Sequence, residues 1–158
     1  MPYSTVGVDS FSAVYTTLPP LGLVVGREAD TTAVTGKSYK LVQAAAAIPA
    51  NAAVYASGVT TSTADATFQV TACSAANQYI LGVNDNAGQA IPSGSYFWIT
   101  IKGKCAPLVA ASIAINTFVV SSATSGTLAA AAAGTSLQAN IFLLAASGAG
   151  GATLAYIA

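Results

Sequence analysis

Short runs in which apolar and polar residues alternate, separated by clusters of Gly, Asn, Ser, Thr and Pro, fill the chain after Gly26. A period of two is typical of β-strands, and the clusters between the runs are typical of turns. The pattern predicts strands over residues 37–43, 53–56, 67–73, 78–83, 95–102, 105–110, 115–121, 139–145 and 152–157. We therefore expect an all-β fold, a small β-barrel or β-sandwich, over residues 26–158.

Residues 95–102 have the clearest alternation in the chain. One face of this strand carries Phe97, Ile99 and Ile101, and the other carries Tyr96, Trp98, Thr100 and Lys102. Because both faces carry large side chains, we expect both to be covered. The face with Trp98 either contacts a partner subunit, with aromatic residues central and lysines at the rim, or forms a second core layer. Gly103 then indicates a bulge or bend, and Lys104 joins this face only if the register is unchanged there.

Two alanine runs, Ala44–Ala47 and Ala129–Ala133, are the candidates for helix by intrinsic propensity. Each run is too short to form a stable helix alone. Pro49 follows the first run and Gly134 follows the second. We therefore expect little or no helix, at most one or two turns.

The first 25 residues differ from the rest, because their bulky side chains follow no period of 2 or 3.6. These side chains are Tyr3, Phe11, Tyr15, Leu18 and Leu21. Pro19-Pro20 favours extended backbone. We interpret residues 1–25 as an extended N-terminal arm that contacts a neighbouring subunit; the alternative is a first strand and loop on its own domain.

Charge is scarce: five basic and five acidic residues make up 6% of the chain, and histidine is absent. An ordinary soluble domain of this length would carry about 40 charged residues. Solubility of a free monomer normally depends on a charged surface. We therefore expect much of the surface to be covered by copies of the chain, as in a homotrimer, or by a larger scaffold.

The same composition argues against several classes of partner. Nucleic acid is a poor partner because the chain has no basic cluster to neutralise phosphates. No apolar run reaches the ~18 residues of a membrane helix. The start, Met1-Pro2-Tyr3-Ser4, lacks the basic and apolar regions of a secretory signal, so we expect synthesis in the cytoplasm.

Catalytic chemistry has little support in the sequence. Without histidine, the commonest general base and metal ligand is missing, and no nucleophile elbow or phosphate loop occurs. Glu28 and Asp30 could pair for acid–base work, but a polar, solvated loop beside Arg27 is the simpler interpretation. Residues 84–88, Asn-Asp-Asn-Ala-Gly, resemble the start of a calcium loop, yet Ser95 stands where a closing Glu is needed, so we expect a tight turn. We predict no catalytic residue, no cofactor and no metal.

The two cysteines, Cys73 and Cys105, lie 32 positions apart without a second ligand near either. This spacing fits no zinc motif. We expect two buried, reduced thiols that act as small apolar residues.

Three stretches share a rhythm of turn and strand residues: Gly36-Lys-Ser-Tyr39-Lys-Leu41-Val, Ile80-Leu-Gly82-Val-Asn84-Asp-Asn86-Ala-Gly88 and Tyr96-Phe-Trp-Ile-Thr-Ile101-Lys-Gly103-Lys. It continues in Ile113-Ala-Ile115-Asn-Thr-Phe118-Val-Val and Ser125-Gly126-Thr-Leu128. In this pattern of turn and strand residues the chain resembles the capsid decoration (cement) proteins of tailed bacteriophages, which are small β-barrel proteins. The resemblance covers about residues 26–157 and leaves the first 25 outside.

The resemblance implies a virion protein that binds the outside of an icosahedral head, often as a trimer, and stabilises it by bridging major capsid subunits. The contact residues would then be Tyr3, Phe11, Tyr15, Leu18, Leu21, Tyr96, Trp98, Lys102 and Lys104. Three alternatives stay open: a subunit of an extracellular pilus or surface layer, a phage head-fibre or tail component, and a carbohydrate-binding module suggested by Trp98 and the tyrosines.

Overall fold

The structure, a computed structural model, describes residues 14–16, 28–30, 36–62, 65–86, 88–133 and 141–158. The regular elements in these ranges are all β-strands, which confirms the predicted fold class. The main sheet contains β1 (Val14–Tyr15), β2 (Glu28–Asp30), β3 (Ser38–Ala44), β4 (Ala53–Ser62), β5 (Asp65–Ala72), β6 (Gly82–Val83), β7 (Tyr96–Cys105), β11 (Ile141–Leu143) and β13 (Ala155–Ile157). A smaller sheet contains β8 (Leu108–Val109), β9 (Val119–Ser121), β10 (Leu128–Ala130) and β12 (Gly151–Ala152).

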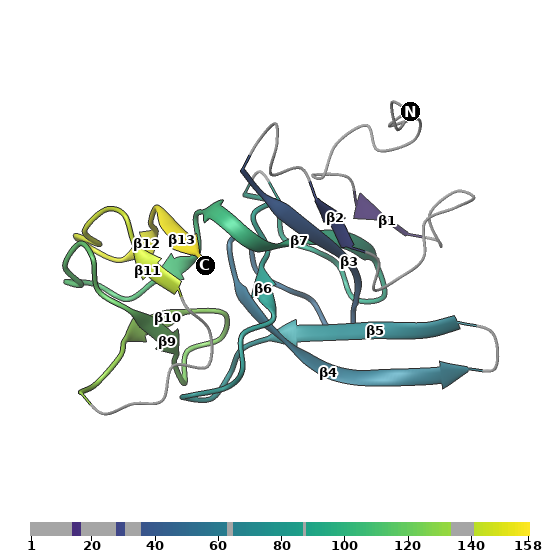
Figure 1. The fold of residues 1–158 in the computed structure, drawn as a ribbon. Helices are drawn as coiled ribbons and strands as arrows, with labels where there is room; N and C mark the ends of the chain where they lie inside the picture. Colours follow the sequence, from purple (N-terminus) through teal and green to yellow (C-terminus); the bar gives the residue numbers. More distant parts are fainter. Residues whose placement is uncertain (1–13, 17–27, 31–35, 63–64, 87, 134–140) are drawn as a thin grey trace.

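Five strands of the main sheet close into a barrel in the order β3-β5-β4-β6-β7 (Figure 1). Closure comes from the antiparallel pairing of β7 with β3, in which Leu41 lies opposite Trp98 and Val42 opposite Phe97. The alternation predicted for residues 95–102 explains the interior, because Phe97 and Ile99 are fully buried in the barrel core. The rest of that core comes from Val42, Ala44, Ile48, Ala52, Val54, Val70, Ala72 and Ile91.

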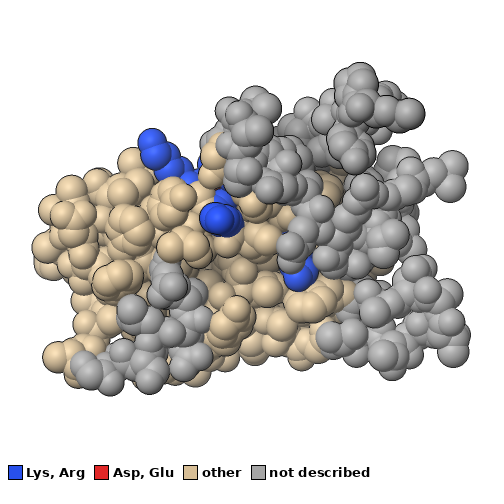
Figure 2. Space-filling model, viewed as in Figure 1, with Lys and Arg blue, Asp and Glu red and all other residues tan. Residues whose placement is uncertain are grey.

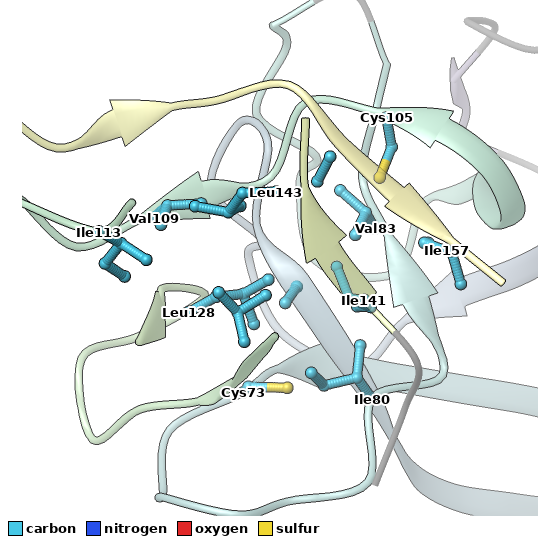
Figure 3. Close-up of a cluster of buried hydrophobic side chains, with 13 residues drawn as sticks. Cys73, Ile80, Val83, Cys105, Val109, Ile113, Leu128, Ile141, Leu143 and Ile157 are labelled. Atoms are coloured by element: carbon cyan, nitrogen blue, oxygen red, sulfur yellow. The ribbon is translucent and has the colours of Figure 1, made fainter. Parts of the chain in front are cut away.

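A second core lies between the barrel wall and the smaller sheet (Figure 3). Ala53 and Val83, which are paired on β4 and β6, face this core, while the adjacent Val54 faces the barrel interior. The second core is completed by Cys73, Ile80, Cys105, Val109, Ile113, Val119, Leu128, Ile141, Leu143, Ala155 and Ile157. Because the start of β4, Ala53–Val54, is buried on both faces, the barrel and the smaller sheet share one continuous folded unit.

The strand β7 connects these two parts. Its first residues pair with β3 and β6, and its last three, Gly103–Cys105, pair with β13. The irregularity predicted near Gly103 is present: the register shifts between Ser38 and Tyr39, which lie opposite Lys102 and Thr100. Gly103 has φ +97°, and a Cβ there would clash with the backbone carbonyl of Gly36. This position therefore requires glycine.

Small residues bring the smaller sheet against the barrel. The N–H of Gly126 donates to the carbonyl of Cys73 at 2.6 Å, and the N–H of Ala53 donates to the carbonyl of Gly126 at 2.8 Å. A Cβ on Gly126 would clash with Ala52. This close approach gives one structural reason for the abundance of alanine and glycine.

Several sequence predictions are corrected by the structure. The strand predicted over 78–83 contracts to Gly82–Val83, and the one over 53–56 lengthens to Ala53–Ser62. Glu28–Asp30 is strand β2, paired with β3, and not a polar loop. The second alanine run begins in β10, which pairs with β8 and β9, so tertiary pairing overrides helix propensity there.

Among the described residues, no helical segment has the length and hydropathy that a membrane span requires.

Candidate interaction surface

A row of aromatic side chains crosses the outer face of the strands that cover the second core. Phe142 in β11 lies opposite Tyr156 in β13, and an isolated bridge pairs Phe118 with Phe142. The rings of Phe118 and Phe142 meet edge to face with centroids 6.1 Å apart, and those of Phe142 and Tyr156 are 5.6 Å apart. Tyr156 in turn lies opposite Lys104 in β7. We call Phe118, Phe142, Tyr156 and Lys104 the aromatic row.

Strand alternation explains why these rings point outward. Ile141 and Leu143 are fully buried in the second core, so Phe142 between them lies on the opposite face. The same alternation turns Tyr156 away from the core. Phe118, whose ring neighbour in the row is Phe142, keeps 44% of its surface exposed.

Two leucines extend the aromatic row along the strands. The N–H of Leu144 donates to the carbonyl of Leu154 at 2.8 Å, which continues the pairing of β11 with β13. Leu144 follows Phe142 by two residues and Leu154 precedes Tyr156 by two, so both share the outer face. Leu154 is 45% exposed. We call the aromatic row together with Leu144 and Leu154 the apolar face.

Lys104, which lies opposite Tyr156, forms the β7 edge of the apolar face, and Lys102 precedes it by two residues in the same strand. Lys102 and Lys104 are both exposed, and among the described residues no carboxylate lies within ion-pair distance of either ammonium group. On the side of the molecule drawn in Figure 2, every charged side chain visible on the described part is basic. Lys102 and Lys104 therefore give the end of β7 a positive charge.

One ion pair ties the start of β3 to the turn after β6. Lys37 Nζ lies 2.7 Å from Asp85 Oδ2, and Asp85 Oδ1 accepts a hydrogen bond from the N–H of Ala106 at 3.2 Å. Burial lowers the pKa of Lys37, but its hydrogen bond to Asp85 and the charge of that carboxylate outweigh the burial and raise the pKa above the usual value. This ion pair links two segments that are distant in the sequence, and both oxygens of the Asp85 carboxylate have a partner within the chain.

The turn of residues 84–86 has a structural role that agrees with the predicted tight turn. The side-chain amide of Asn84, which is fully buried, donates to the carbonyls of Pro49 at 2.9 Å and Gln89 at 3.0 Å. Within the described ranges, no group of three or more His, Cys, Asp or Glu side chains could hold a metal ion.

Of the residues predicted to contact a partner, four lie outside the described residues: Tyr3, Phe11, Leu18 and Leu21. Tyr15 belongs to β1 and pairs with Tyr96 in β7, and both side chains are half-buried. This part of the N-terminal segment therefore lies along its own barrel. A partner contact by the arm stays a prediction.

Trp98 and the two lysines, predicted to share one contact face, differ in exposure. Trp98 keeps 2% of its surface exposed, whereas Lys102 and Lys104 are exposed. Trp98 is therefore as buried within the single chain as a core residue is. The lysines lie where a partner could reach them.

Cys73 and Cys105 are free and buried. Their sulfur atoms lie at different sides of the second core in Figure 3. Burial raises the pKa of each thiol from 9.0 to about 12. Both cysteines therefore behave as small apolar core residues.

Sequence reasoning did not single out Phe118, Phe142 and Tyr156. The signal was present in the predicted strands 139–145 and 152–157, where apolar residues occupy both faces. The sequence does not indicate which of the two faces is buried, because burial depends on the register with β7 and on the position of the smaller sheet.

Fold and surface together define a small closed β-barrel with a second β-layer docked on it and an exposed apolar face. No model of a known protein family matches the chain, and no curated protein sequence matches it either. Among solved structures, the chain is similar to the N base of the head fiber protein gp8.5 of bacteriophage phi29, with a TM-score of 0.55 and 11% sequence identity. The match covers 76% of this chain and 92% of that chain. At this identity, the likeness shows a shared fold.

Proposed function

We propose that this chain is a structural protein of a bacteriophage virion that binds the outside of an icosahedral head. It stabilises the head by bridging neighbouring major capsid subunits, and it acts as a homotrimer through contact alone, without catalysis. The observation that carries the proposal is the fold shared with the base of a phage head fiber, matched over nearly the whole of that base.

Two properties of the chain support this proposal independently of the fold. Only 6% of its residues are charged, which suits a protein whose surface is largely covered in an assembly. The exposed side chains include a cluster of large apolar groups, and such clusters mark protein interfaces more often than they occur on free monomers.

A second candidate, the base of a head fibre, is favoured by the same fold comparison. The two candidates differ in what lies above the barrel. A decoration protein ends at the head surface and connects capsid subunits laterally, whereas a fibre base carries a further protein segment that projects outward.

A density map of virions that contain this chain tests both candidates. We expect the barrel at positions on the outer head surface where several capsid subunits meet, with three copies around each position. Continuous density rising from each barrel identifies a fibre base, and a low, closed trimer identifies a decoration protein. Virions without the barrel on the head contradict both, and isolated single copies contradict the trimer.

Head stability gives a second test. Heads that lack the chain should lose their DNA at a lower temperature than complete heads, and added purified chain should restore the difference. Unchanged heat resistance would leave binding intact but remove the proposed stabilising role.

A further inference from the structure

We propose that the apolar face is the surface that binds the major capsid subunit, and that its partner surface is apolar with carboxylate groups opposite Lys102 and Lys104. This assignment rests on the proposed function and adds the binding face and the chemistry of the partner.

The first argument is that the apolar face lies outside the two buried cores of the single chain. The strands β11 and β13 already bury Ile141 and Ile157 in the second core through their inner faces. Their outer side chains continue an apolar surface from Phe118 to Tyr156, with 44% of Phe118 exposed. Contiguous apolar groups of this kind are costly in water unless a partner covers them.

The aromatic row extends across several neighbouring strands. Its four members come from four neighbouring backbone segments, so at ~4.8 Å between segments the row spans about 14 Å. Aromatic residues at the centre with long cationic side chains at the edge are the usual arrangement of an interface core and its rim. Phe142 and Tyr156 occupy the centre of the row, with Phe118 at one end and Lys104 at the other.

The positive charge of the lysines on β7 indicates what kind of partner surface fits the apolar face. Lys102 and Lys104 add two positive charges near the end of β7. Asp85, which accepts a hydrogen bond from the N–H of Ala106 just after β7, is held by Lys37 at 2.7 Å. A second copy that met this face with its own apolar face, as across a twofold axis, would bring the same lysines to the contact and would leave them without carboxylates. Contacts within a homotrimer instead join two different faces of the chain. A capsid subunit with Asp or Glu at that position pairs with them and gains in association rate.

The experiment compares binding of variants of the full chain to heads assembled without it. The apolar variant is Phe118→Ser and its control is Tyr79→Ser, in which a residue that is 62% exposed in the loop after β5 is changed in the same way. The charge variant is Lys104→Glu and its control is Lys104→Arg. Circular dichroism and the thermal midpoint of each variant establish that it is folded.

We expect Phe118→Ser and Lys104→Glu each to weaken head binding by at least about tenfold, and Tyr79→Ser and Lys104→Arg to change it less than about threefold. Raising the salt concentration should weaken binding of the wild type more than that of Lys104→Glu. Should Phe118→Ser fail to fold, Leu154→Ser provides the same test from the neighbouring strand.

Three outcomes overturn the assignment. If the wild type binds heads and both variants bind equally well, the apolar face is not the binding face, although the proposed function stands. If the wild type self-associates and Phe118→Ser abolishes that association without changing head binding, the face belongs to a second copy. If the wild type does not bind heads at all, both the proposed function and this assignment fail.

Discussion

Replacing Leu128 by Ala tests whether the barrel and the smaller sheet unfold together. Leu128 lies on β10 in the smaller sheet, is fully buried, and shares the second core with Ala53 and Val83 of the barrel wall. Leu→Ala changes at such sites cost about 3–5 kcal/mol, because the lost transfer free energy adds to the cost of the cavity. A domain of this size has about 5–15 kcal/mol of total stability, so the change should remove a large part of it.

Trp98 provides the readout, because it is the chain's single tryptophan and is buried in the barrel strand β7, whereas Leu128 lies in the smaller sheet. In guanidinium unfolding, tryptophan fluorescence and far-ultraviolet circular dichroism should give one coincident transition. Leu128→Ala should shift both signals equally, and the thermal midpoint should fall by roughly 6–20 °C. The control Leu128→Met keeps the volume of the side chain and should cost less than about 1.5 kcal/mol.

The reasoning would be refuted by a fluorescence transition that stays in place while the dichroism signal splits into two steps. That result would mean that the smaller sheet unfolds alone and that the second core does not couple it to the barrel.

Further predictions concern the backbone, the thiols and the arm. Gly103→Ala should destabilise the chain by at least about 1–2 kcal/mol, because its φ of +97° and the adjacent backbone exclude a Cβ, whereas Gly58→Ala, with open space around it, should be close to neutral in chemical unfolding. Cys73 and Cys105, with pKa values raised from 9.0 to about 12, keep their protons in the folded state while the unfolded chain loses them, so stability should fall as pH rises from 9 toward 12. A double Cys→Ala variant should show a flatter alkaline decline, and an equally steep one would contradict the assignment. Deleting residues 2–13 should leave the thermal midpoint of the barrel nearly unchanged and weaken binding to heads; unchanged binding would exclude a contact by this part of the arm.

The local pattern of the sequence was enough to predict strands and the identity of many core residues. Alternation over residues 95–102 correctly assigned Phe97 and Ile99 to one buried face, because side-chain direction in a strand is a local property. The glycine at 103 likewise indicated an irregular strand, since a residue without Cβ is favoured where the backbone adopts positive φ.

Long-range pairing lay beyond the sequence. The assignment of Glu28–Asp30 to a loop was wrong because pairing with β3 compensates for weak intrinsic strand preference. Ala129 and Ala130, which end β10, form a strand for the same reason, since they pair with Val120 and Val119 of the neighbouring β9.

The sequence by itself determined a chain of short strands, poor in charge and without histidine. Only the tertiary structure decided that β7 closes a barrel with β3 and also carries β13, and that Phe118, Phe142 and Tyr156 meet on an outer face. The physical reason is that a strand with apolar residues on both sides can bury either one, and the choice depends on distant segments that supply its partners and cover its faces.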